Sequence, residues 1–312
     1  MLAPFSRSLA ALKVRLSAAL ALFLGASACG GGPGPIDPNP PPPVGPARPE
    51  IVSPANGSQA GTDSPTLVVR NAVGFDGSQS EYTFRVTSTS GRQEFYSATV
   101  PGGTTQTSHT VSATLPRGML LAWSVLARKS GGEAASDVSR FRGPDVECAT
   151  SGDPFAKSVV DWFIPECSLE NNIFNDPTEV LGPPDSRGMG PTGFTGFVSL
   201  GEGGYVTVDM EVCAVDLVGA DVRVYQRASS EPVTLYAAGS PEGPFLLLGA
   251  RQPCGAPSTG LRSGHCTFDL EAAEIEVARY FKIEDGELYP CPGDTVSEGA
   301  DIDAIELLNQ AP

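Results

Sequence analysis

The stretch Gly204-Tyr-Val-Thr-Val-Asp-Met-Glu-Val212 is the clearest fold signal in the chain. Apolar side chains occupy every second position from Val206 to Val212, and this period of two predicts a strand with one buried and one solvated face. Similar short runs, separated by Gly and Pro turns, lie at residues 221–225, 233–236, 245–248, 280–283 and 302–308. Residues 155–312 are therefore expected to form a β-sandwich of the jelly-roll type, with one helical turn over residues 270–277.

The preceding part of the chain shows the same periodicity. In Glu81–Thr87 and in Leu121–Ala127, aromatic and aliphatic residues alternate with polar or small ones. No helical periodicity interrupts this pattern between residues 50 and 143. We therefore expect a smaller β-sandwich over residues 50–143, with Trp123 in its core, and a Gly- and Pro-containing junction over residues 144–154.

Three segments of the smaller region carry a family resemblance: Ile51–Gly57, Tyr82–Val86 and Leu121–Ala127 with the following Arg128. They resemble segments of bacterial fibronectin type III or immunoglobulin-like domains, and the last one matches the Trp-containing strand of that family. The resemblance implies a two-sheet sandwich that acts as a spacer.

The larger region contains a longer succession of motifs, at Phe174–Pro177, Val180–Asp185, Phe197–Gly204, Gly219–Tyr225, Ala278–Asp285 and Gly299–Glu306. This order resembles a family of bacterial cell-surface domains with a galactose-binding-like, discoidin-type jelly roll. The resemblance implies an all-β fold and display at the cell surface. Two features depart from the family: Gln226 stands where many relatives place an acid, and the cysteine content is unusual.

The N-terminus has the three parts of an export signal. Residues 1–28 carry three basic residues and no acid, and an apolar run over residues 16–25 precedes small residues. The run is shorter than the roughly 20 apolar residues of a membrane span. Ala26-Ser-Ala-Cys29 resembles a lipobox, although Ala26 stands where Leu is usual, and the resemblance implies that Cys29 is lipidated. An ordinary signal peptide with an unmodified cysteine is the alternative.

A Pro- and Gly-rich linker occupies residues 29–49. Proline lacks the amide donor and fixes its φ, so neither helix nor sheet is expected there. In a polyproline II conformation, at ~3.1 Å per residue, such a segment would extend roughly 60 Å. We interpret it as a disordered spacer between the lipid anchor and the folded domains.

The charge of the chain bears on its partners. It carries 20 Lys and Arg against 36 Asp and Glu, a formal net charge of −16. Such a surface repels nucleic acid and anionic lipid head groups. We therefore expect no nucleic-acid partner, and we expect the lipid alone to attach the protein to a membrane. That membrane is the cell membrane or the outer membrane, and the folded domains are expected to face the periplasm or the exterior.

Six cysteines remain when Cys29 is set aside, an even number suited to disulfides in an oxidising compartment. Cys254 and Cys266 bracket a Gly-, Pro- and Ser-rich loop and are expected to form a local bridge. The pairs expected after that one are Cys148–Cys167 and Cys213–Cys291. Spacing alone does not choose among the possible pairings. Zinc is the competing interpretation, but the chain has no C-x-x-C pair, and the only histidine near these cysteines is His265.

No catalytic motif is present. The chain has two histidines, the usual general base, and lacks the G-x-S-x-G, S-x-x-K and H-E-x-x-H patterns. Gly201–Gly204 is rich in glycine, but a strand follows it where a phosphate site needs a helix, so a turn is expected. A glycosidase-type carboxylate pair is the remaining catalytic hypothesis, and nothing singles one out. We therefore expect no enzyme activity and no catalytic cofactor.

Asp301 and Asp303 suggest a cation site at the start of the final strand. Calcium takes about six to eight oxygen ligands from carboxylates, amides and carbonyls. The galactose-binding-like resemblance implies a structural calcium between an early loop and the last strand. By this resemblance Asn175 and Asp176 are the early ligands, and Glu306 is a further candidate. Solvated turn carboxylates are the alternative.

Glycan binding is the expected activity of the jelly roll. Such folds bind sugars through exposed aromatic side chains, and the candidates are Trp162, Phe194, Tyr225 and Tyr289. Core burial is the alternative for each of them. The sequence thus predicts a non-catalytic lipoprotein whose jelly roll binds a glycan or a cell-envelope partner, with a structural or assembly role as the alternative.

Replacing Cys29 by Ser should release the protein from membranes, because serine lacks the thiol that carries the lipid, and two or more acyl chains are what makes anchoring stable. Fractionation of cells followed by immunoblotting measures this. The Ser27→Ala variant keeps the cysteine and should stay in the membrane fraction. A Cys29→Ser protein that remained membrane-bound would refute the lipidation.

Overall fold

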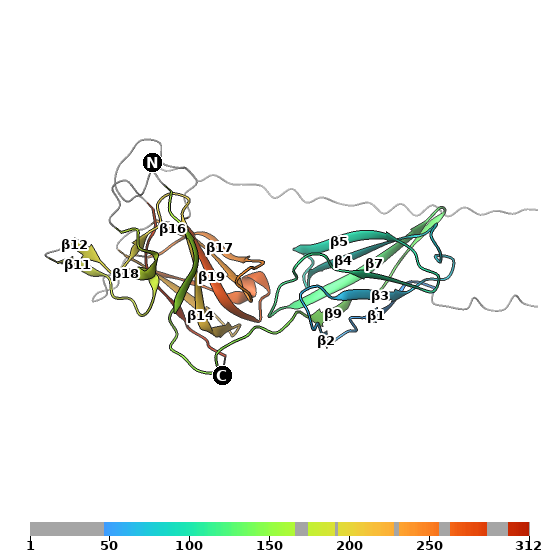
Figure 1. The fold of residues 1–312 in the computed structure, drawn as a ribbon, viewed down its shortest axis with the longest axis horizontal. Helices are drawn as coiled ribbons and strands as arrows, with labels where there is room; N and C mark the ends of the chain where they lie inside the picture. The colour runs from blue at the N-terminus through green and yellow to red at the C-terminus, as the bar shows by residue number, and fades with distance from the viewer. Residues whose placement is uncertain are drawn as a thin grey trace, which may run out of the picture. The chain divides into compact units, whose positions relative to one another are not determined.

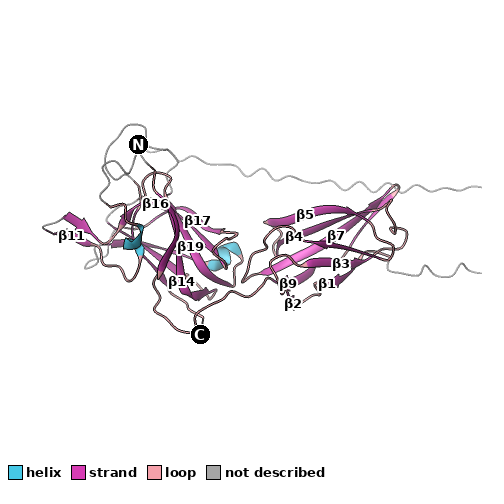
Figure 2. Ribbon diagram, in the orientation of Figure 1, coloured by secondary structure: helices cyan, strands magenta, loops and turns pink. Residues whose placement is uncertain are grey.

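The computed structural model describes residues 47–165, 174–190, 193–227, 231–255, 263–285 and 299–311. In these residues the chain is built of strands and loops, with two short 3-10 turns, η1 (Pro177–Val180) and η2 (Leu270–Ala273) (Figure 2). The expected all-β class is confirmed. The predicted export signal, Cys29 and most of the Pro-rich linker lie outside the described residues.

Two sheets form the first sandwich (Figure 1). The smaller sheet has the order β1-β3-β6, and the larger has the order β2-β9-β7-β4-β5, with β8 added to β7. The strands are β1 (Glu50–Ser53), β2 (Ser58–Gln59), β3 (Thr66–Arg70), β4 (Glu81–Ser88), β5 (Glu94–Pro101), β6 (Gln106–Thr110), β7 (Leu120–Lys129), β8 (Gly132–Ala135) and β9 (Ser139–Arg142).

Trp123 lies in the core of this sandwich, as expected. It is opposite Val86 in the pairing of β7 with β4, and its side chain is 1% exposed. The indole N–H donates to the carbonyl of Pro54 at 3.1 Å. Because this hydrogen bond satisfies the only polar atom of the ring, the tryptophan packs in the core without a desolvation penalty.

The second sandwich begins at β10. Its five-stranded sheet has the order β10-β14-β19-β16-β17, its four-stranded sheet has the order β13-β20-β15-β18, and β11 pairs with β12. The strands are β10 (Ser158–Phe163), β11 (Arg187–Gly190), β12 (Gly193–Thr195), β13 (Val198–Ser199), β14 (Tyr205–Val215), β15 (Val222–Arg227), β16 (Pro232–Ala238), β17 (Leu246–Pro253), β18 (Ser263–Phe268), β19 (Val277–Asp285) and β20 (Asp301–Leu307).

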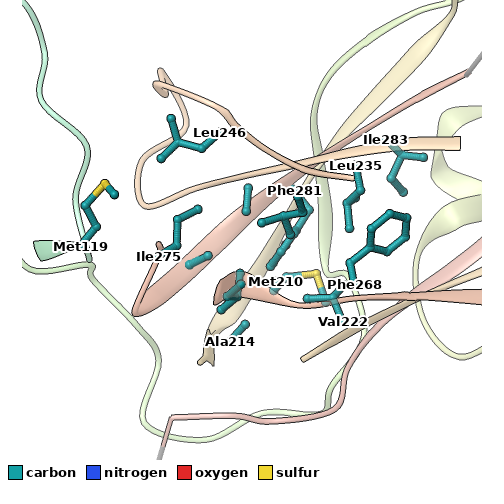
Figure 3. Packing of buried hydrophobic residues seen from close by; sticks show 14 of the residues in the cluster. Met119, Met210, Ala214, Val222, Leu235, Leu246, Phe268, Ile275, Phe281 and Ile283 are labelled. Atoms are coloured by element: carbon teal, nitrogen blue, oxygen red, sulfur yellow. The ribbon is translucent and has the colours of Figure 1, made fainter. Parts of the chain in front are cut away.

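The alternation of β14 determines what lies between these two sheets. Val206 and Val208 are opposite Ile283 and Phe281 of β19, and all four side chains are fully buried. Figure 3 shows inward side chains of both sheets packed together, among them Met210, Leu235, Phe281, Phe268 and Val222. The intervening residues of the same strands therefore point to the opposite, outer face of the five-stranded sheet.

Two disulfides are present among the described cysteines. Cys254–Cys266, with its Cα atoms 4.4 Å apart, confirms the expected local bridge. The expected pairs Cys148–Cys167 and Cys213–Cys291 are wrong, because Cys148 is bonded to Cys213 with a Cα separation of 5.4 Å. The amide of Ala149 donates to the carbonyl of Glu211 at 2.8 Å, so main-chain pairing brings these two cysteines together. Cys167 and Cys291 lie outside the described residues.

Main-chain hydrogen bonds join the two sandwiches, which belong to one compact unit over residues 43–312. The buried Met119 and Ile275 form an antiparallel bridge, and the amides of Glu276 and Val277 donate to the carbonyl of Gly118 at 2.8 and 2.9 Å. A Cβ atom on Gly118 would lie 2.2 Å from the Val277 carbonyl oxygen. Glycine is therefore required for this close approach.

Glu274 adds a charged contact to the same junction. Its carboxylate accepts hydrogen bonds from the Ser88 hydroxyl at 2.9 Å, the Thr89 hydroxyl at 2.5 Å and the Ser90 amide at 3.0 Å. Burial alone would raise its pKa, but the hydrogen bonds from the Ser90, Thr89 and Ser88 segment outweigh burial and lower the pKa from 4.5 to about 2. The folded protein therefore favours the charged carboxylate.

The Glu274→Gln variant should be less stable at neutral pH by about 1.5–3 kcal/mol, the range for hydrogen bonds to a charged group. Since the folded pKa lies below the unfolded one, this contribution is complete above pH 4.5 and disappears as the pH falls toward 2. Thermal unfolding of both proteins across this range measures the effect. Glu179→Gln, an exposed position on η1, is the control. A stability difference that stayed constant with pH would contradict this explanation.

Candidate functional site

Asp301 and Asp303 both lie on β20, but their side chains have different partners. Asp303 is 1% exposed, and its Oδ1 accepts hydrogen bonds from the main-chain amides of residues 185 and 186 at 3.0 and 3.2 Å. Burial raises the pKa of Asp301 to about 6, against the lowering effects of a hydrogen bond with Ser199 and the charge of Arg227. The start of β20 is therefore a buried, carboxylate-rich segment.

The remaining expected calcium ligands are engaged elsewhere. Asp176 caps η1, and its Oδ1 accepts the amide and the hydroxyl of Thr178 at 2.9 and 2.7 Å. Glu306 accepts hydrogen bonds from Arg223 at 3.0 Å and from Tyr225 at 2.8 Å. Asn175 directly precedes the η1 cap. Calcium binding by this set stays a prediction, and two of its carboxylates would have to exchange partners to bind an ion.

A different acidic group was missed by sequence analysis. Within the described ranges, Asp216, Asp221 and Asp269 are the one set of three or more His, Cys, Asp or Glu side chains whose ligand atoms all lie within 4.8 Å of one another. Burial raises the pKa of Asp216, and repulsion by Asp221, Asp269 and Glu271 raises it further. Asp216 and Asp221 share the loop between β14 and β15, but Asp269 follows β18, 48 residues after Asp221, so no spacing motif could have revealed the cluster.

The outer face of the five-stranded sheet carries the more distinctive arrangement. Phe163 of β10 is opposite Tyr205 of β14, which is opposite Glu284 of β19. Two residues before Glu284 on β19, Lys282 is opposite Tyr236 of β16, which is opposite Leu247 of β17. We call this set the sheet-face stripe, and its members are Phe163, Tyr205, Glu284, Lys282, Tyr236 and Leu247. The stripe crosses all five strands from one edge of the sheet to the other.

Lys282 lies at the centre of the stripe. Its Nζ is 4.1 Å from the centroid of the Tyr205 ring and 5.9 Å from that of the Tyr236 ring. The same ammonium group forms an ion pair with Glu284 at 2.5 Å. Cation–π contacts and the ion pair together hold the lysine between the two tyrosines.

The tyrosine hydroxyls are oriented by carboxylates. Tyr205 donates to Asp161 at 2.9 Å, and its pKa is raised first by this hydrogen bond and then by burial. For Tyr236, burial is the main cause of a raised pKa, followed by the nearby charge of Glu284. Both phenols therefore stay neutral and serve as oriented polar groups beside their own rings.

The ends of the stripe are open to solvent. Phe163 is 50% exposed and Leu247 is 46% exposed, on the two edge strands of the sheet. The rings of Phe163 and Tyr205 are tilted at 35° with centroids 6.2 Å apart. Exposed apolar and aromatic side chains of this kind, interspersed with hydrogen-bonding groups, are typical of a binding surface.

The aromatic residues named from the sequence do not form this surface. Trp162 is 45% exposed, but it is opposite Val206 and so points to the other side of β10 from Phe163. Tyr225 is 8% exposed and belongs to the four-stranded sheet, where its hydroxyl donates a hydrogen bond to Glu306. The side chain of Phe194 and the whole of Tyr289 lie outside what the structure describes.

The two histidines have separate environments. His109 bonds through Nε2 to the Tyr96 hydroxyl at 2.5 Å on the first sandwich. His265 is exposed on β18, with its ring centroid 6.0 Å from that of Tyr225. The two residues lie on different sandwiches and share none of these contacts, so they do not act as a pair.

No protein-family model and no curated protein matches this chain. In those residues, the structure contains no helix with the length and apolar character needed to cross a membrane.

Excess calcium should raise the melting temperature of the mature chain if an ion binds either acidic group. The Asp216→Asn variant should melt higher than the wild type without calcium, because it removes a repelled charge, and should gain less from calcium. The Asp301→Asn variant instead loses the calcium effect if β20 holds the ion. Scanning calorimetry with calcium and with chelator distinguishes these results, and identical melts in both conditions would exclude calcium at either place.

Proposed function

We propose that this protein is a non-catalytic, exported surface lipoprotein whose second sandwich binds glycan through the sheet-face stripe. The observation that carries the proposal is the row of Phe163, Tyr205 and Tyr236 with Lys282 and Glu284 among them, on the outer face of one sheet. In this proposal Cys29 supplies the membrane attachment, and the first sandwich separates the binding surface from the anchor.

The chemistry of the stripe suits sugars. A pyranose ring presents a face of C–H groups, which packs on aromatic rings, and a rim of hydroxyls, which need donors and acceptors. Lys282 supplies a donor, while Asp161 and Glu284 supply acceptors next to the rings. Half-buried aromatic side chains lose little conformational entropy on binding, which favours them as contact residues.

The disulfides support an extracytoplasmic location. Cys148–Cys213 and Cys254–Cys266 require an oxidising compartment. The acidic chain, with a net charge of −16, disfavours nucleic acid and anionic membrane surfaces as ligands. Both features agree with a protein displayed in the envelope or outside the cell.

A glycan array probed with the mature chain tests the proposal, and binding to at least one glycan class is the expected result. The Tyr236→Ala variant should lose about tenfold in affinity or more for that glycan, since truncation of a contact aromatic commonly costs more than 1 kcal/mol. Isothermal titration measures the loss, and an unchanged melting temperature shows that the variant is folded.

Trp162→Ala is the matched control. This aromatic residue is 45% exposed and is adjacent to Phe163 in sequence, but it faces the other side of the strand. Its affinity should equal that of the wild type. An array without any bound glycan, or equal losses in the Trp162 and Tyr236 variants, would argue against glycan binding at this face.

A further inference from the structure

We infer that the ligand of the sheet-face stripe is an elongated, uncharged oligosaccharide that lies across the strands, and this inference depends on the glycan binding proposed above. The observation that leads to it is the course of the stripe. Phe163 and Leu247 lie on the two opposite edge strands, and Tyr205 and Tyr236 lie on strands between them. The contact residues thus cross all the strands of the sheet, with one offset of two residues along β19.

The length of this line favours a chain ligand. Neighbouring strands are about 4.8 Å apart, so the four spacings between β10 and β17 span roughly 19 Å. One sugar covers only a part of that distance, whereas several linked sugars would contact the stripe along its whole length. A flat sheet face touches the ligand from one side only, so affinity has to accumulate from successive contacts.

The charges at the stripe favour a neutral ligand. Three ionisable side chains lie beside its tyrosines. Lys282 packs on Tyr205 and Tyr236. The carboxylate of Asp161 accepts a hydrogen bond from Tyr205, and the charge of Glu284 raises the pKa of Tyr236. One cation faces two anions, and that cation is already paired with Glu284. A uronate or a phosphate-bearing polymer would meet net negative charge here.

Arg279, the next cation on β19, does not change this balance. Its guanidinium forms two hydrogen bonds of 2.7 Å with the carboxylate of Asp209. Such a bidentate pair is neutral as a unit and has its donors directed at its own acid. Among the described residues of β19, the two cations nearest the stripe, Lys282 and Arg279, are therefore both paired with acids.

Isothermal titration with glucose oligomers and N-acetylglucosamine oligomers, from the disaccharide to the hexasaccharide, tests the inference. Galacturonate oligomers of the same lengths serve as anionic probes. Affinity for a neutral series should rise at least tenfold from disaccharide to hexasaccharide, and galacturonate oligomers should bind at least tenfold more weakly. The Phe163→Ala and Leu247→Ser variants should reduce the hexasaccharide-to-disaccharide affinity ratio several-fold, because they remove the ends of the stripe.

The Trp162→Ala variant should keep the wild-type ratio, and melting curves confirm that each variant is folded. Equal affinity for all lengths, or tighter binding of galacturonate, would overturn the inference while leaving glycan binding itself in place. Absence of binding to every glycan, on the array and in titration, would overturn both. Self-association that Lys282→Glu abolishes in sedimentation, without any glycan binding, would assign the stripe to a protein interface and would also overturn both.

Discussion

The register of β19 between β14 and β16 is the constraint on which the second sandwich depends. With Phe281 and Ile283 facing the core, Lys282 and Glu284 face outward beside Tyr205 and Tyr236. A slip by one residue would bury the ion pair and expose the core residues, so burial of one face enforces the composition of the other. The same hydrophobic contacts that fold the domain therefore also assemble the outer stripe.

The junction between the sandwiches depends on other contacts, since it combines main-chain pairing with a partly buried charge. Gly118 allows the backbones to approach, and Glu274 accepts hydrogen bonds from the loop that follows β4. An unpaired buried carboxylate would be costly, so the contact favours one arrangement of Ser88–Ser90 against Glu274.

Much of the fold could be predicted, because strict apolar alternation, as in β4, β7 and β14, indicates both a β-strand and which of its faces is buried. Strands such as β6 and β10 were missed, since Gln106–Thr110 is polar and Ser158–Phe163 is an exposed edge. The sheet-face stripe was not predicted, because Tyr205, Lys282 and Tyr236 become neighbours only through the order of the strands in the sheet. Apolar alternation does not reveal that order. The Cys148–Cys213 pairing likewise depends on contacts between distant segments, so spacing misassigned it.

Amide chemical-shift mapping tests the proposed glycan binding on the outer face of the five-stranded sheet most directly. The mature chain would be titrated with the hexasaccharides of glucose and of N-acetylglucosamine. We expect shifts concentrated at residues 161–163, 205–207, 234–236 and 282–284. Shifts concentrated instead at residues 223–227 and 301–306, on the four-stranded sheet, would contradict this expectation.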